Sequence, residues 1–525
     1  MVRIIILCSI LAFLATQCQG AKILMAFPTP SRSHMIYASA IMKGLAARGH
    51  SVTVLSAFPQ DKPIPNYRDI KISIDDEIKD MINSFSKEGG SQASFFANFK
   101  QIINVSLRSA NNSFHEEQWQ KVMREESFDL VIVGMFFNNF VFGLGDHFKC
   151  PVIGIWSGGI TGIINEMSGN PSAVDSVPHL FLGKVNEMNF LNRLKTFLIT
   201  GIEKVMWTYI NYREKEYYDF NFPSPKYKTY DEMKKNISLF FVNDHFSVNA
   251  PRPTVPGVVE VAGLHIKSKP DPLPQKMQEF IDGAEHGVIF FSLGSNIKSN
   301  LLPPEKLDAI LKTFSKLKQR VLFKWESDSL QNQPKNVLTQ KWMPQDDILA
   351  NEKVRVFVSH GGLGGINEAK YHGVPIVGIP FFADQMSNLA SAENEGWAQV
   401  VDLKDLTEET FTRAILEIVN NKKYKDVIQG ISTLYRDRPA SALDTAVYWA
   451  EYVIRHKGAP HLQSHAVQLN FLQRTSIDVI AFVALVLLIV FKIIAFSLCF
   501  CWRKVTKSGS TSTKKTRRNP KTKGE

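Results

Sequence analysis

Short apolar runs alternate with amphipathic stretches along the chain from residue 21 onward. The run AKILMAF at 21–27 predicts a strand, residues 35–48 an amphipathic helix, and HSVTVLSAF at 50–58 a second strand. Further strands are predicted near Asp129, where FDLVIVGMFFNNF occupies 128–140, and near Val152. A β-α-β succession is typical of a parallel sheet covered by helices on both faces. The first half of the chain is therefore predicted to be an α/β domain.

The second half repeats this pattern after a proline-rich crossing. APRPTVPG at 250–257 and KPDPLPQ at 269–275 are typical of a connection between domains. Beyond them, strands are predicted at 287–295, 321–326, 337–342, 354–360 and 374–380, with helices between them. The pattern predicts two α/β domains, an N-terminal one at 21–250 and a C-terminal one at 286–450, joined by a linker at 251–285. A return helix and juxtamembrane segment are predicted at 451–478.

Both ends of the chain have membrane signals. Residues 1–20 combine Arg3, an apolar core at 4–15 and small residues up to Gly20, which predicts a cleaved signal peptide. Residues 479–502 are long and apolar enough to span a bilayer, and their one charge, Lys492, could snorkel to the interface. The basic tail at 503–525 is then expected in the cytoplasm, with the two α/β domains in the lumen. The chain is predicted to be a single-pass type I protein.

Charge and cysteine content narrow the class further. The 525 residues have a net charge of +11, but nine Lys or Arg and one Glu follow Trp502, so the tail holds +8 and the rest only +3. A nearly neutral folded part argues against nucleic-acid binding. Cys8 and Cys18 leave with the signal peptide, and Cys499 and Cys501 lie at the membrane edge. Cys150 remains alone, so no internal disulfide is expected in the exported part.

The stretch WMPQDDILANEKVRVFVSHGGLGGINEAKYHGVPIVGIPFFADQ at 342–385 contains the candidate chemistry. The predicted strand at 354–360 runs into four glycines within five positions and then a helix, where free backbone amides suit an anion such as phosphate. The next strand ends at FFADQ, on the edge of the sheet where ligands of α/β proteins bind. Neither this loop nor Gly143-Leu144-Gly145 completes the G-x-G-x-x-G dinucleotide fingerprint, which disfavours an NAD-dependent oxidoreductase.

Over its whole length this stretch resembles the signature of the UDP-glycosyltransferases, the glucuronosyl- and glucosyltransferase family. The resemblance implies the GT-B fold, in which two Rossmann-like domains face a cleft. It also implies that Trp342 and Gln345 face the uracil and that His360 and the Gly365 amide face the diphosphate. By the same resemblance Glu368 takes the ribose hydroxyls, Asp384 and Gln385 hold the sugar, and Ser295 touches the donor phosphate. Gly364 stands where many members have Asn, so one polar contact to the diphosphate is expected to be lost.

The resemblance also identifies His34, in the SH pair at the start of the first helix, as the base that deprotonates the acceptor hydroxyl. A helix N-terminus disfavours imidazolium and keeps the ring able to accept a proton. The family's carboxylate partner follows the strand that begins Phe128-Asp129, and alignment places Gly134 at that position. Replacing Gly134 with Asp is therefore expected to improve transfer to alcohols.

Three other residues near Gly134 are candidates to replace the missing acid. Asn138 and Asn139 follow closely, but an amide cannot take up a proton as a carboxylate does. Asp146 is the nearest acid downstream, and a solvated helix residue is the simpler interpretation of it.

Sequons begin at Asn104, Asn111 and Asn236 and predict glycosylation of surface loops. Aromatic residues between 157 and 230 are assigned to acceptor binding and membrane contact. Lys521 and Lys523 occupy the positions of a lysine-based signal for retrieval to the endoplasmic reticulum. The chain has no D-x-D motif, which argues against the metal-dependent class of glycosyltransferase and predicts that neither a metal nor another cofactor is needed.

These observations predict a membrane-anchored UDP-glycosyltransferase that moves a hexose or hexuronate from UDP-glucose or UDP-glucuronate to a small lipophilic acceptor, with inversion. Detoxification or hormone and pigment metabolism are the expected settings, and a homo-oligomer is left open. The alternative is a catalytically impaired UDP-sugar-binding membrane protein, supported by the missing acid at Gly134.

Overall fold

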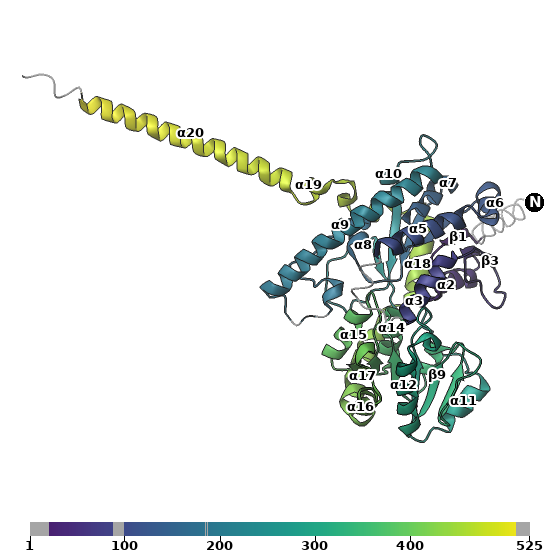
Figure 1. Ribbon diagram of the computed structural model, residues 1–525. Helices are drawn as coiled ribbons and strands as arrows, with labels where there is room; N and C mark the ends of the chain where they lie inside the picture. Colours follow the sequence, from purple (N-terminus) through teal and green to yellow (C-terminus); the bar gives the residue numbers. More distant parts are fainter. Residues whose placement is uncertain (1–19, 88–98, 184, 186, 511–525) are drawn as a thin grey trace, which may run out of the picture. The chain divides into compact units, whose positions relative to one another are not determined.

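A computed structural model of the chain describes residues 20–510 apart from 88–98, 184 and 186 (Figure 1). Its first half is built on a seven-stranded parallel sheet with the order β3-β2-β1-β4-β5-β6-β7. The strands are β1 Lys22–Phe27, β2 Ser51–Ser56, β3 Tyr67–Lys71, β4 Leu130–Gly134, β5 Val152–Trp156, β6 Ile237–Val242 and β7 Val258–Glu260. Their central members are apolar at nearly every position, as a sheet buried on both faces requires.

Helices cover both faces of this sheet. They are α2 Arg32–Ala47, α3 Asp76–Lys87, α5 Phe99–Phe114, α6 Glu117–Glu125, α7 Leu144–Phe148, α8 Gly162–Ser168, α9 Phe190–Asn221 and α10 Tyr230–Lys234, with short 3₁₀ turns η1 Asn139–Gly143 and η2 Leu180–Leu182. The predicted strand at 128–140 ends at Gly134, because the chain turns through Asn138 into η1.

The second half is built on a six-stranded parallel sheet with the order β10-β9-β8-β11-β12-β13. Its strands are β8 Val288–Ser292, β9 Arg320–Lys324, β10 Val337–Gln340, β11 Val354–Ser359, β12 Ile376–Gly378 and β13 Ala398–Val400. Its helices are α11 Gln275–Asp282, α12 Pro304–Lys316, α13 Gln345–Leu349, α14 Leu363–His372, α15 Gln385–Asn394, α16 Glu408–Asn420 and α17 Lys422–Arg436, with 3₁₀ turns η3 Ser299–Leu301 and η4 Leu403–Asp405. Two parallel sheets of this kind confirm the predicted fold class.

In each sheet the order in which consecutive strands are added changes direction at one point. The candidate residues lie just after the strands on either side of that point. In the first sheet the reversal lies between β1 and β4, and in the second between β8 and β11. Ligands of open α/β sheets bind outside the carboxyl ends of such strands. A hydrogen bond from Asn296 to Ser31 (3.4 Å) joins the two halves at these points, and another runs from Asn367 to Asn243, which follows β6 (2.9 Å).

The connection between the halves differs from the predicted linker at 251–285. β7 lies inside that range but forms the edge of the first sheet, and α11 packs Met277 and Ile281 into the core of the second half. The crossing proper is therefore shorter. Asp347 holds this connection against the second half. Both of its carboxylate oxygens lie 2.7 Å from Lys267 Nζ, and one accepts a hydrogen bond from Asp271 N.

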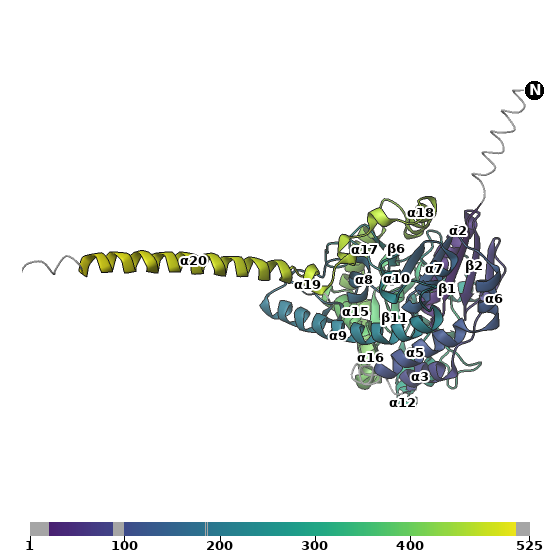
Figure 2. The same ribbon diagram turned by 90° about the horizontal axis from the view of Figure 1, so that it is seen from above.

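Helix α18, Ala442–Arg455, returns the chain to the first half (Figures 1 and 2). It lies against α2 and buries Ala446, Val447 and Val453 in the core of the first sheet. The α2–α18 contact also includes an ion pair between Arg48 and Glu451 at 3.1 Å. Helix α18 begins at Ala442, well before the range 451–478 given to the return helix and juxtamembrane segment. The compact body closes with η5, Pro460–Leu462.

The C-terminal unit, residues 465–525, is described by itself. It contains η6 His465–Gln468, α19 Phe471–Arg474 and the long helix α20 Ile477–Ser510. Residues 477–506 of α20 are long and apolar enough to cross a membrane. The predicted signal peptide lies outside the described residues except for Gly20, and Lys521 and Lys523 also lie outside them.

The three sequon asparagines and Cys150 differ in their secondary structure and burial. Asn236 is exposed in the turn before β6, as predicted. Asn104 and Asn111 instead lie half-buried within helix α5, so the prediction of surface loops is wrong for these two. The Oδ1 atom of Asn104 is fully enclosed, and Asn111 accepts a hydrogen bond from Asn221 at 2.9 Å. Cys150 is a free thiol whose pKa is raised to about 12, mainly by burial.

Candidate active site

His34 stands in the first turn of α2, immediately after the carboxyl end of β1. Its ring is half-buried and meets the Phe136 ring edge to face, with centroids 5.2 Å apart. The Nδ1 atom is enclosed and has no hydrogen-bond partner among the described residues. Burial lowers the pKa of His34 to about 4. The imidazole is therefore neutral near pH 7, with its lone pair available to a proton.

Gly134 lies opposite Phe27, one position beyond the paired residues Ala26 and Val133 of β1 and β4. The Phe27 ring, 3% exposed, fills the space over Gly134. A Cβ atom added at Gly134 would stand 2.0 Å from Phe27 Cδ2, far inside van der Waals contact. The missing acid is thus replaced by an aromatic ring, and the space that a carboxylate would need is occupied.

The other polar residues near Gly134 form hydrogen bonds that involve the backbone. Asn138 donates to Gly134 O at 2.8 Å and accepts from Phe136 N at 2.6 Å, which fixes the turn after β4. Asn139 N donates to the buried Glu214 carboxylate at 2.9 Å. Asp146 accepts from Lys228 N at 2.9 Å, and this contact supports its interpretation as a structural residue.

His360 follows β11, and its ring packs closely against Gly294 and Gly362. A Cβ at Gly294 would stand 2.5 Å from His360 Cε1, and one at Gly362 would stand 2.5 Å from Nε2. Gly294 also has φ +80°, a conformation that favours glycine. The neighbouring Ser295 Oγ is enclosed without a hydrogen-bond partner among the described residues, as is His360 Nδ1. Polar atoms without protein partners are suited to bind a ligand at this point.

A buried lysine side chain lies near His360. Lys324, at the carboxyl end of β9, pairs with Glu326 at 2.6 Å, and its side chain is 8% exposed. Burial lowers the pKa of His360 to about 4, and the charge of Lys324 contributes. The ring is therefore neutral, and the fixed positive charge in this region comes from Lys324. A positive charge and a neutral donor suit a diphosphate.

Glu368, on α14, is 5% exposed, and its carboxylate contacts two side chains. The Gln345 amide donates to Glu368 Oε2, and His265 Nε2 lies 3.4 Å from Oε1. Burial alone would lower the pKa of His265, but its hydrogen bond to Glu368 and the charges of Glu368 and Asp346 raise it above the ordinary value. Gln345 and Glu368, the predicted nucleoside residues, are therefore in contact, and His265 orients the carboxylate.

Trp342 is 45% exposed and lies beneath a residue of the first half. The guanidinium carbon of Arg32 stands 4.2 Å from the centre of its ring. Arg32 precedes His34 by two residues on α2, so the helix of the predicted base touches the side chain predicted to face the uracil. This cation–π contact brings the helix of the predicted base close to the predicted uracil site.

The loop before α14 presents backbone amides. Gly362 is the N-cap of this helix, and the amides of Leu363, Gly364 and Gly365 precede the first helical hydrogen bond, from Ile366 to Gly362 O. A Cβ at Gly364 would have its nearest neighbour, His265 Cε1, 4.0 Å away. A Cβ atom at position 364 would therefore meet no steric clash.

The predicted sugar residues lie where α15 begins, after β12. Gln385 accepts from Phe381 N at 2.8 Å and Phe382 N at 3.1 Å through Oε1, which directs its NH₂ group away from the backbone. Asp384 accepts from Asn388 at 2.7 Å, and burial raises its pKa. Asn388 also donates to Gly361 O at 3.0 Å, which links this segment to the glycine loop.

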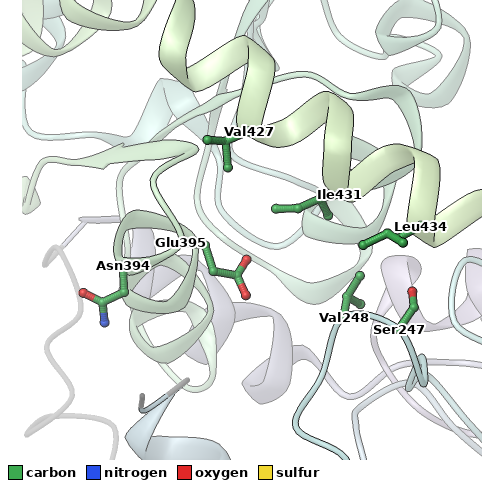
Figure 3. A pocket seen from close by; sticks show the side chains of 7 residues that line it. All are labelled: Ser247, Val248, Asn394, Glu395, Val427, Ile431 and Leu434. Carbon is green, nitrogen blue, oxygen red and sulfur yellow. The ribbon is translucent and has the colours of Figure 1, made fainter.

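A separate cavity of about 340 Å³ is lined by residues of both halves (Figure 3). Its lining comes from the end of α15, from α17 and from the loop after β6, with Asn394, Glu395, Val427 and Val248 among its residues. None of the predicted site residues lines it. The candidate active site therefore lies at the strand ends and not in this cavity.

Comparison with known proteins decides the family. Residues 21–512 match the family model described as UDP-glucoronosyl and UDP-glucosyl transferase. The chain belongs to the UDP-glycosyltransferase family. This UDP-glycosyltransferase is 38% identical over 486 residues to UDP-glucosyltransferase 2 of Dactylopius coccus, covering 91% of this chain and 93% of that protein. It is 29% identical over 511 residues to UDP-glucuronosyltransferase 1A3 of Rattus norvegicus, covering 93% and 92%.

A solved structure supports the fold of this UDP-glycosyltransferase. A UDP-glucose: anthocyanidin 3-O-glucosyltransferase in complex with UDP matches with a TM-score of 0.54 at 16% identity, over 84% of this chain and all of that one. The match confirms the GT-B architecture. Because the curated relatives are named glucosyl- and glucuronosyltransferases, the chain is a glycosyltransferase, and the non-catalytic alternative is not favoured.

Four residues of this UDP-glycosyltransferase were not identified from the sequence. Arg32 stood beside His34 in the motif, but only the contact between the halves gives it a place over Trp342. His265 and Lys324 lie far along the chain from the side chains they influence. The sequence does not distinguish Phe27 from the other apolar residues of its strand, and only the register with β4 places its ring at Gly134.

The packing of Phe27 changes the expected effect of Gly134→Asp. Alone, this substitution should destabilise the protein by about 1 to 3 kcal/mol, the usual effect of overpacking, without improving transfer to alcohols. Combined with Phe27→Ala, it should place a carboxylate in the vacated space and raise the rate with an aliphatic alcohol. Thermal unfolding and initial rates measure both effects.

The matched control is Gly430→Asp, because a Cβ at this position of α17 meets nothing within 4 Å. It should leave the unfolding midpoint nearly unchanged. A single Gly134→Asp variant that is as stable as the wild type and faster with alcohols would contradict the packing argument.

Proposed function

We propose that this enzyme transfers a hexose or hexuronate, with inversion, from a UDP-sugar to the hydroxyl of a small lipophilic acceptor. The observation that carries the proposal is the environment of His34. Phe136 meets its ring, Phe137 lies against Phe136 with centroids 4.8 Å apart, and Trp207 lies 6.1 Å beyond Phe137. An aromatic wall beside a neutral base suits an apolar acceptor with one hydroxyl group.

In the proposed step, the acceptor oxygen attacks the anomeric carbon of the donor sugar. A new carbon–oxygen bond forms while the bond to the diphosphate oxygen breaks, and UDP leaves with that electron pair. The acceptor proton passes to His34. Attack from the face opposite the leaving group inverts the anomeric centre. Ser295, His360 and the Gly365 amide hold the diphosphate in this proposal, with Lys324 nearby, while Asp384 and Gln385 hold the sugar hydroxyls.

Transfer is proposed to need no metal, because neutral donors, free amides and a buried lysine can meet the charge of the leaving diphosphate. The sugar is not specified by these residues. Purified full-length protein should be incubated with UDP-glucose, UDP-glucuronate and other UDP-sugars, with a phenol and an aliphatic alcohol as acceptors, with and without a chelator. Transfer of at least one hexose or hexuronate that survives chelation supports the proposal. Binding of UDP without transfer to any acceptor would overturn it.

The proposed setting is the endoplasmic reticulum membrane, with the body in the lumen, a cytoplasmic tail that includes Lys521 and Lys523, and a role in detoxification or in hormone or pigment metabolism. The apolar helix α20 and the family membership support membrane anchoring. A homo-oligomer and use of the sequon at the exposed Asn236 are compatible with this setting.

Topology gives a direct prediction. Protease added to sealed microsomes should remove only a few kilodaltons, the tail beyond Trp502, because the bilayer shields the body. Detergent is the control and should expose the whole chain to cleavage. Complete digestion without detergent would place the body in the cytoplasm, and immunoblotting against the body distinguishes the two results.

A further inference from the structure

Helix α9 contains a carboxylate, Glu214, that is completely buried. Each of its oxygens accepts a hydrogen bond, Oε1 from the Asn139 backbone amide at 2.9 Å and Oε2 from the Tyr230 hydroxyl at 2.7 Å. Lys234 attracts the carboxylate from a longer distance but forms its own ion pair with Asp231 at 3.3 Å. Among the described residues, Glu214 therefore depends on hydrogen bonds and has no ion-pair partner.

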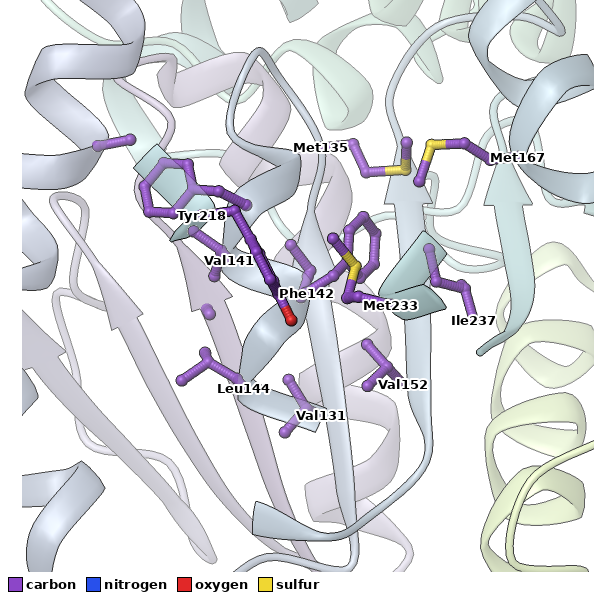
Figure 4. Close-up of a cluster of buried hydrophobic side chains, with 14 of the residues drawn as sticks. Val131, Met135, Val141, Phe142, Leu144, Val152, Met167, Tyr218, Met233 and Ile237 are labelled. Carbon is purple, nitrogen blue, oxygen red and sulfur yellow. The ribbon is translucent and has the colours of Figure 1, made fainter. Parts of the chain in front are cut away.

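The surroundings of Glu214 are largely apolar. Tyr218, one turn further along α9, lies in a cluster of buried side chains with Val141 and Phe142 of η1 (Figure 4). Burial raises the pKa of Glu214 to about 7, although its hydrogen bonds oppose this shift. Because taking a charge out of water costs free energy, an apolar side chain of similar size would serve the stability of this core as well or better. Stability alone therefore does not account for the carboxylate.

The amide that Glu214 holds is the first of η1, and the turn before it is strained. Phe137 has φ +51°, a left-handed conformation that is unfavourable for a bulky side chain. Such a conformation persists only where the surrounding structure holds it. The Asn138 side chain supplies one restraint through its hydrogen bond to Gly134 O, and Glu214 supplies another at Asn139 N.

This turn places two aromatic side chains beside His34. The Phe136 ring meets the imidazole edge to face at 5.2 Å, and the Phe137 ring lies 4.8 Å from that of Phe136. Only two residues separate Phe136 from Asn139, so a shift of the Asn139 amide would move the aromatic rings as well. The burial that lowers the pKa of His34 to about 4 depends in part on this contact.

We propose that Glu214 is a positioning residue for the acceptor side of the active site. By holding the Asn139 amide it fixes the strained turn after β4, and this turn keeps Phe136 against His34. Glu214 is enclosed and acts through Phe136, which shields the imidazole from water and forms part of the aromatic wall. The inference rests on the proposed function, in which that wall receives a lipophilic acceptor.

The test compares Glu214→Leu with Glu214→Gln in the full chain. Leucine removes both acceptor oxygens, so the turn should relax and water should reach His34. The pKa of His34 should then rise from about 4 toward its ordinary value of 6.5. An NMR titration of the histidines measures this shift, and His34→Ala identifies the resonance. Glutamine keeps an acceptor for Asn139 N and should hold the pKa near that of the wild type. The control is Glu216→Leu on the same helix, whose side chain is 44% exposed.

Kinetics with a phenol as acceptor supply a second measurement. Glu214→Leu should raise the acceptor KM by about two- to tenfold, the usual effect of losing one aromatic contact. The affinity for UDP should stay unchanged, because the predicted donor residues lie in the second half. Phe136→Ala should raise KM by a similar factor. Adding Glu214→Leu to Phe136→Ala should have little further effect, since Glu214 acts through Phe136.

Two results would overturn the inference. One is an unchanged His34 pKa in a Glu214→Leu variant that binds UDP normally. The other is a double variant whose KM rises by the product of the two single effects, because Glu214 would then act independently of Phe136. If leucine prevents folding, Glu214→Asp keeps the acid but shortens its reach and should raise the His34 pKa part of the way, and no rise would count equally against the inference. The NMR titration needs no sugar transfer, so the proposed function can fail independently.

Discussion

His34→Ala should lower kcat with an aliphatic alcohol by about 10² to 10⁴, the usual contribution of general-base catalysis. The loss with a nitrophenol should be smaller, because a phenol of that kind ionises near neutral pH and needs less help. Burial lowers the pKa of His34 to about 4, so the ring is a weak base and the loss with an alcohol should lie toward the lower end of this range. A base so weak has little driving force to remove a proton from an alcohol.

The same pKa sets the pH dependence. His34 is active when neutral, and a lowered pKa keeps it neutral at every pH well above 4. The wild-type rate with an alcohol should therefore be constant from neutral pH down to about pH 5. It should then fall as the ring takes up a proton, approaching tenfold for each further pH unit. The alanine variant should lose this inflection.

His115→Ala is the matched control, since His115 is an exposed histidine of the same half. It should leave both the rate and the pH profile unchanged. UDP binding by the His34 variant should equal that of the wild type, which separates a catalytic loss from unfolding. Equal losses with alcohol and nitrophenol, or an inflection near pH 6.5, would contradict the role given to His34.

Glu368→Ala should weaken UDP binding by about ten- to a hundredfold. Hydrogen bonds to a charged group are worth about 1.5 to 3 kcal/mol, and the substitution removes the acceptor proposed for the ribose hydroxyls. It also releases the Gln345 amide and His265. Isothermal titration calorimetry with UDP measures the effect directly.

His265 supplies a second readout for the same variant. Glu368 contributes to the forces that hold the pKa of His265 above its ordinary value against burial. Without that carboxylate the balance shifts toward burial, so the pKa of His265 should fall, as an NMR titration would show. Glu368→Gln keeps the shape and one acceptor and should restore part of the affinity. Glu305→Ala, in the exposed first turn of α12, is the control. Wild-type affinity in Glu368→Ala would remove this residue from the site.

The local patterns of the chain were sufficient to predict several of its elements. The apolar run at 354–360 is β11, the glycine-led stretch after it begins α14, and the run at 479–502 lies within α20. Buried parallel strands must be apolar on both faces, and helices need a repeating apolar stripe, so these elements are evident in consecutive residues. The strand ends then place His34, Ser295 and His360 at the carboxyl edges of their sheets, because every strand of a parallel sheet points the same way.

Helix ends and side-chain positions were less predictable. The proline-rich range at 251–285 suggested a bare linker, yet β7 and α11 form within it because each finds a sheet or a core to pack against. Asn104 and Asn111 had the sequence of glycosylation sites, but helix α5 holds both. The presence of a short motif does not show whether its residues are folded into a helix.

The sequence by itself determined the two α/β halves, the glycine loop and the absence of an acid at Gly134. Only the tertiary structure decided what replaces that acid, since Phe27 and Gly134 meet through the register of β1 and β4. The same holds for Arg32 on Trp342 and His265 on Glu368, pairs that join residues far apart in the chain. Periodicity reports which side of an element is buried, whereas strand order and the packing of the two halves decide which side chains meet.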